Sequence, residues 1–117
     1  MTASDSVGIP SMVHVAELGA LIEVAADATV SRTALKAEGA RVVLFAFDAG
    51  QELSEHTAAI PILLQVLDGR LRVGAAGEQV ELAPGGLVHI GARVPHDVLA
   101  LEPSRMVLTM LDPRSTS

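Results

Sequence analysis

Four histidines are the side chains in this sequence best suited to chemistry. His14, His56, His89 and His96 each carry an imidazole, which can ligate a metal ion or move a proton near neutral pH. The chain of 117 residues contains no cysteine, which excludes disulfides, thiolate nucleophiles, cysteine-bound zinc and iron–sulfur clusters. The chemistry open to this chain is therefore chiefly that of imidazole.

Other catalytic motifs are absent from the sequence. The glycine-containing stretch 74–77 lacks the lysine of a phosphate-binding loop, and there is no Gly-x-Ser-x-Gly elbow. Ser54 stands two residues before His56, but no other residue indicates a catalytic triad. Histidine remains the best candidate for function.

Two of the histidines follow turns. His56 comes after the turn that begins at Gly50, and His96 comes directly after Pro95. We expect each at the entrance of a strand, where a rigid sheet can aim a side chain. The hypothesis is that these two imidazoles face each other inside a rolled-up sheet.

The spacing around these two residues resembles the cupin family. Gly50, five residues, His56 and later Gly69 match the outer spacing of the first cupin motif, G-x5-H-x-H-x3-4-E-x6-G. The second motif, G-x5-P-x4-H, is resembled by PGG at 84–86, LVHI at 87–90 and VPH at 94–96. The resemblance covers residues 41–111 and is to small, single-domain bacterial cupins.

This resemblance implies an antiparallel jelly-roll β-barrel, usually a homodimer, with a divalent metal ion (Zn, Fe, Mn or Ni) in the barrel mouth. It makes His56 and His96 two of four metal ligands, while the other two ligand positions carry Ala58 and Ile62. Neither side chain can coordinate a cation, so the expected site is a reduced one. His89, on the strand before His96, is the candidate third ligand.

Short apolar runs separated by turn residues predict an all-β fold. Asp68-Gly69, between two such runs, predicts a two-residue hairpin, and turns are expected at residues 74–77 and 84–86. The predicted strands are residues 21–25, 29–36, 41–47, 62–67, 70–73, 79–82, 87–90, 98–101 and 106–111.

Three parts of the chain are predicted. Residues 29–112 form the cupin-like barrel, and residues 113–117 form a loose tail. Residues 1–28 form an N-terminal arm with a short helix over residues 12–18, which Ser11 caps and Gly19 ends. The arm is available to pair across a homodimer.

Composition limits the partners of this chain. Half of the residues are hydrophobic but only two are aromatic, so the core must be aliphatic. Fourteen acidic against eight basic residues give a net charge of −6, which argues against a nucleic-acid partner. No apolar run reaches the ~18 residues of a membrane span, and the N-terminus lacks the basic region of a signal peptide. We therefore expect a cytoplasmic protein without a membrane partner.

Three functional hypotheses follow, and the sequence leaves open whether the protein is an enzyme. The resemblance implies metal-dependent oxygenase or isomerase chemistry on a small molecule. Alternatively, an apolar barrel holds a small-molecule ligand without catalysis, for example as a sensor, which the apolar Ala58 and Ile62 favour. The third hypothesis is a structural dimer without a ligand.

Overall fold

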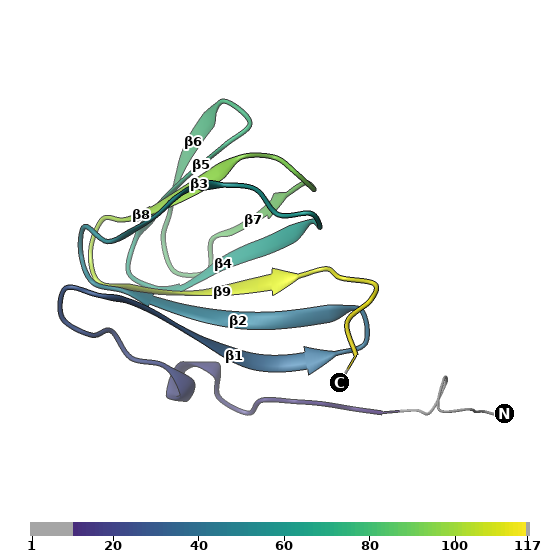
Figure 1. Ribbon diagram of the computed structural model, residues 1–117. Coiled ribbons are helices and arrows are strands. Elements are labelled where there is room, and N and C mark those ends of the chain that lie inside the picture. The colour runs from purple at the N-terminus through teal and green to yellow at the C-terminus, as the bar shows by residue number, and fades with distance from the viewer. Residues whose placement is uncertain (1–10, 117) are drawn as a thin grey trace, which may run out of the picture.

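The computed structural model describes residues 11–116 and consists of two antiparallel sheets packed face to face (Figure 1). In the five-stranded sheet the order is β1 (Thr29–Ala37), β2 (Ala40–Phe47), β9 (Ser104–Met110), β4 (Ile62–Asp68) and β7 (Leu87–Ile90). In the four-stranded sheet the order is β3 (Glu52–His56), β8 (His96–Ala100), β5 (Leu71–Ala75) and β6 (Glu78–Leu82). The all-β prediction is confirmed. Strand pairing does not join the two sheets within residues 11–116, so the closed barrel that we expected is not observed.

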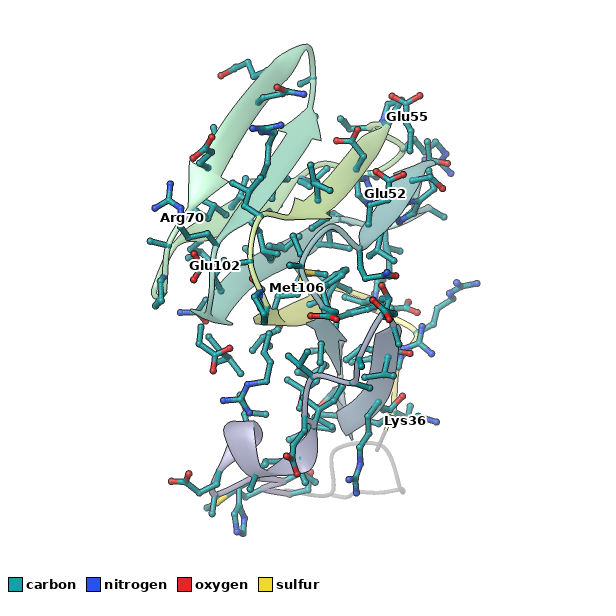
Figure 2. The ribbon with its side chains drawn as sticks, turned by 90° about the vertical axis from the view of Figure 1, so that its left-hand side faces the viewer. Lys36, Glu52, Glu55, Arg70, Glu102 and Met106 are labelled. Carbon is teal, nitrogen blue, oxygen red and sulfur yellow. The ribbon has the colours of Figure 1, made fainter. Side chains whose placement is uncertain are left out.

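The core lies between the two sheets and is aliphatic, apart from Phe47. On β4 the side chains alternate, so that Leu64 and Val66 are buried while Gln65 between them is exposed. Met106 of β9 is fully buried in the interior, where Figure 2 shows it. Burial of each such side chain stabilises the fold by roughly 1.5–3 kcal/mol. The buried members are Phe47, Ile62, Leu64, Val66, Leu71, Val73, Ile90, Val98, Ala100, Met106 and Leu108.

A second apolar cluster lies on the outer face of the five-stranded sheet. Leu44, Ala46 and Val107 point to this face, and the N-terminal segment covers them with Ile22. The chain forms only one 3₁₀ turn here, η1 (Leu18–Leu21). The helix expected over residues 12–18 and the strand expected over residues 21–25 are both wrong. The apolar residues of this segment are positioned by the sheet beneath them, which outweighs their weak local preference.

The link between β4 and β5 carries the chain from one sheet to the other. The Asp68-Gly69 hairpin is therefore a wrong prediction, because β4 and β5 do not pair. Gly69 has a φ of +84°, and a Cβ there would collide with the side chain of Ser104. The buried Ser104 hydroxyl lies 3.0 Å from the backbone N of Arg70 and 2.7 Å from the carbonyl oxygen of Glu102. These contacts provide partners for the backbone where the sheet ladder stops.

The two-residue hairpin occurs one connection later, between β5 and β6. Ala76 and Gly77 form its turn with φ values of +53° and +77°. Positive φ at both central residues is the signature of a type I′ turn. The turn predicted within residues 74–77 is thus confirmed, while Gly74 and Ala75 belong to the strand.

The remaining predicted strands match β1, β2, β4 to β9 to within three residues at each end. The strand β3, which carries His56, was not predicted. The segment after β9, expected to be loose, returns to the β1–β2 turn, where Ser115 accepts a hydrogen bond from the Gly39 N–H and donates one to the Ala40 carbonyl. No helix in residues 11–116 is long and apolar enough to cross a membrane.

Candidate functional site

His56 and His96 lie opposite each other on adjacent strands. His56 ends β3, His96 begins β8, and the two residues are register partners in the four-stranded sheet. The ring centroids are 4.3 Å apart with an interplanar angle of 60°. The structure thus brings together the two imidazoles that the sequence analysis singled out. His96 stands at a strand entrance as expected, whereas His56 stands at a strand end.

An irregularity in β3 makes this pairing. Leu53 pairs with Val98 and His56 with His96, so two residues of β3, Ser54 and Glu55, oppose a single residue of β8. Such a bulge shifts the alternation of side chains by one position. Val98 is buried in the core, and the bulge returns His56 to the side of the sheet that Leu53 faces.

The charged residues of β3 lie on the other side. Figure 2 shows Glu52 and Glu55 pointing away from the interior, and both are exposed. Glu52 shares the parity of His56 in the sequence, but the bulge between them separates their faces. Glu52 therefore does not contribute to the histidine pair.

Both imidazoles are held by the same kind of contact. Nδ1 of His56 lies 2.7 Å from the carbonyl oxygen of Ser54, and Nδ1 of His96 lies 2.9 Å from that of Val94. A carbonyl oxygen only accepts hydrogen bonds, so Nδ1 carries the proton in each neutral ring. Nε2 then keeps its lone pair in both rings, which is the form that ligates metal ions.

The two histidines differ in their exposure to solvent. His96 is 3% exposed and belongs to the inner surface, while His56 is exposed. The pair therefore lies at the boundary between the core and the solvent. A small ligand can approach it from the side of His56.

The two other cupin ligand positions are apolar and packed. Ile62 is 2% exposed within the core, and Ala58 packs against the same cluster. The Ala58 carbonyl oxygen accepts a hydrogen bond from the Arg93 N–H at 2.7 Å, which joins the segment after His56 to the loop before His96. Among residues 11–116 no group of three histidine, aspartate or glutamate side chains is placed to hold a metal ion.

His89 is not brought to the pair. It lies on β7 of the five-stranded sheet, opposite Leu63, and is exposed. Its neighbour Ile90 is buried in the core, and adjacent residues of a strand point to opposite faces. The structure thus places the predicted third ligand on the outer side of the other sheet.

The outer face of the four-stranded sheet is polar. Glu81 accepts a hydrogen bond from Arg70 at 2.7 Å, and Arg72 lies 3.6 Å from the same carboxylate. The hydrogen bond from Arg70 lowers the pKa of Glu81. Asp97, next to His96 in sequence, lies on this outer face above Gly74, where a Cβ would meet its carboxylate. Asp97 is therefore on the opposite face of β8 from the ring of His96.

A cavity of about 220 Å³ adjoins the site. Ala75 and Val94 line it, and each is a neighbour of His96: Ala75 is its register partner on β5, and Val94 holds its Nδ1. Neither His56 nor His96 lines the cavity itself. The sequence analysis expected an apolar pocket, but the pairing of β5 with β8 that places it beside His96 cannot be read from residue order.

Comparison with known proteins identifies the fold. No protein-family model matches the sequence, and no curated protein does either. Among solved structures, a conserved protein of unknown function from Streptococcus pyogenes superposes with a TM-score of 0.77 at 24% identity, over 90% of this chain and 92% of that one. A cupin superfamily protein from Desulfitobacterium hafniense has a TM-score of 0.76 at 21% identity, over 81% of this chain and 87% of that one.

This chain has the cupin fold. A further cupin-like match is the salicylate 1,2-dioxygenase of Pseudoaminobacter salicylatoxidans, with a TM-score of 0.69 at 18% identity, over 77% of this chain and 28% of that one. The resemblance to cupins that the histidine and glycine spacing indicated is thus confirmed. The cupin fold does not by itself define a reaction, since one fold hosts many functions.

Proposed function

We propose that this protein binds a divalent metal ion through Nε2 of His56 and Nε2 of His96. The observation that carries the proposal is the matched pair of Nδ1 contacts to the Ser54 and Val94 carbonyl oxygens. Metal-ligating histidines characteristically donate the proton of their other ring nitrogen to a carbonyl or carboxylate oxygen, which fixes the ring orientation. Two rings with centroids 4.3 Å apart are close enough to share one ion.

The donor set fits an open site rather than a closed one. Catalytic metal sites usually have three protein ligands, and here Ala58 and Ile62 add none. Two imidazoles suit Zn, Fe, Mn or Ni, and the remaining coordination positions are left to water or to an oxygen-bearing small molecule. We expect weaker metal affinity than in a three-ligand site.

Oxygenase or isomerase chemistry on a small molecule is the activity that we propose for the loaded site. A bound divalent ion would supply Lewis-acid polarisation of an oxygen-bearing substrate. The protein's own part is positional: Ser54 and Val94 orient the two rings through backbone carbonyls. The exposed edge of His56 leaves the approach to the pair open. The dioxygenase among the fold neighbours supports this class of chemistry only by analogy.

Metal analysis of protein prepared without an affinity tag tests the proposal. The wild type should bind one Zn²⁺ per chain in a calorimetric titration, and His56→Ala and His96→Ala should each lose this binding. His89→Ala is the matched control, because His89 lies on the outer face of the other sheet, and it should bind as the wild type does. Equal binding by the wild type and both pair variants would contradict the proposal.

A further inference from the structure

We propose that the cavity beside His96 is a separate binding site for a small, uncharged, apolar molecule. The cavity lies between two strands that end their sheets. β6 is the last strand of the four-stranded sheet and β7 the last strand of the five-stranded one. Figure 1 shows the β5–β6 hairpin rising away from β7. Residues of both strands line the cavity, so its opening lies between two sheet edges.

The lining determines which chemistry the cavity accepts. Its aliphatic residues come from both sheets and the loop before His96: Val73, Ala75, Val80, Val88, Ile90 and Val94. Val73 and Ile90 are 2% and 3% exposed and form its buried part. The charged or titratable residues that line it are Glu78 at the start of β6 and His89. Burying a charged group against aliphatic side chains without a partner is costly, so a neutral molecule is favoured.

The volume sets the size of the ligand. A cavity of roughly 150 Å³ lined by apolar side chains binds benzene, whereas drug-sized ligands need roughly 300 Å³ or more. The 220 Å³ found here lies between these limits. It suits a substituted benzene ring or a branched aliphatic molecule of similar size.

This site is separate from the histidine pair but shares a wall with it. Neither His56 nor His96 lines the cavity, so an apolar ligand needs no metal ion there. Val94 belongs to both places, because it lines the cavity and its carbonyl oxygen lies 2.9 Å from Nδ1 of His96. A ligand that contacts Val94 should therefore alter the environment of the His96 ring.

Toluene is a suitable probe, used with the full chain in the absence of metal. We expect saturable binding, a higher melting temperature, and chemical-shift changes in the methyl groups of Val73, Val88 and Val94. Val88→Phe fills the cavity from the edge strand and should abolish these changes. Val24→Phe makes the same substitution at an exposed valine outside the cavity and should leave toluene binding intact. Benzoate should bind at least ~10-fold more weakly than toluene because its charge would be buried.

Two further variants separate this proposal from that of the metal site. His56→Ala should keep toluene binding while it loses metal, and folded Val88→Phe should keep metal while it loses toluene. If Val88→Phe does not fold, Ala75→Leu is the second cavity-filling variant. Absence of toluene binding to the folded wild type, or wild-type toluene affinity in a folded cavity-filled variant, would overturn the proposal. Loss of toluene binding in folded His56→Ala would overturn the independence of the two sites.

Discussion

The guanidinium of Arg105 on β9 holds the carboxylate of Asp68 at the end of β4. Nη2 of Arg105 lies 2.6 Å from Oδ2 of Asp68, and Nε lies 3.0 Å from the same oxygen. Nη1 donates to the carbonyl oxygens of Gly19 and Ile22 in the N-terminal segment. The hydrogen bond to Asp68 raises the pKa of Arg105, so the group stays charged. One side chain thus joins two strands of the sheet to the segment that covers its outer face.

Arg105→Gln should loosen this segment. Hydrogen bonds to charged groups are worth roughly 1.5–3 kcal/mol, and we expect the free energy of unfolding to fall by about that amount. Arg32 also donates to the N-terminal segment, at the Leu21 carbonyl, but it is exposed. Arg32→Gln is therefore the control and should cost less than about 1 kcal/mol. Urea unfolding measures both. Equal losses in the two variants would show that Arg105 has no special role in holding the segment.

The connection between the sheets gives a second prediction. Gly69 and Gly77 both have positive φ, but only Gly69 has other residues in the way of a Cβ. Gly77→Ala should therefore cost about 1–2 kcal/mol, the strain of a left-handed alanine. Gly69→Ala should cost markedly more, because Ser104 and the Pro103 carbonyl must move. Thermal unfolding of the two variants measures the difference, and similar melting temperatures would contradict it.

These two glycines also show what the sequence could predict of the fold. The dipeptide Asp68-Gly69 has the residue types of a hairpin turn, and local pattern alone favours pairing of the strands on either side. The structure uses Gly69 for a crossing instead, because the buried Ser104, far away in the chain, supplies hydrogen bonds to Arg70. Strand positions were predictable from local alternation, whereas the sheet that each strand joins depends on such distant contacts.

The acid stability of the β2–β3 turn is a third prediction. Asp48 accepts hydrogen bonds from the backbone N–H of Asp27 at 2.7 Å and of Ala49 at 2.9 Å. These bonds, chiefly that from Asp27, lower the pKa of Asp48 below its ordinary value of 3.8. A carboxylate with a lowered folded pKa contributes stability above its unfolded pKa, and this stability is lost as the pH falls through the folded pKa.

Asp48→Asn keeps an acceptor oxygen but removes the titrating group. We expect the variant to lose less stability than the wild type between about pH 5 and about pH 2, where carboxylates become protonated. Urea unfolding at several pH values gives the two profiles. Parallel profiles would mean that Asp48 does not contribute to the acid sensitivity of the fold.

The homodimer expected from the sequence stays a prediction. Met12 and Leu87 are 86% and 59% exposed, so large apolar side chains face outward in a single chain. Burial of such a side chain is worth roughly 1.5–3 kcal/mol, which corresponds to a ~10- to 100-fold change in affinity. If the N-terminal arm pairs across the dimer, Met12→Ser should weaken association by that factor in sedimentation equilibrium. Gln79→Ser, an exposed polar control, should not. A wild type that stays monomeric at all concentrations would contradict the dimer.

The histidine site was predictable in part. The spacing from Gly50 and Pro95 singled out His56 and His96, and these two meet. The bulge at Ser54 and Glu55, which brings His56 to the inner side, was not predictable, because a one-residue insertion leaves no clear mark in so short a strand. The position of His89 was open for the same reason: strand parity gives a face only when the register is known.

Nitrogen NMR of the imidazole rings during a Zn²⁺ titration tests the central claim most directly. In metal-free protein near neutral pH, the account predicts that His56 and His96 both carry their proton on Nδ1. On addition of Zn²⁺, the Nε2 signals of these two rings should shift together and saturate, while His14 and His89 stay unchanged. Zn²⁺ that shifts His14 or His89 instead, or leaves all four rings unaffected, would contradict the account.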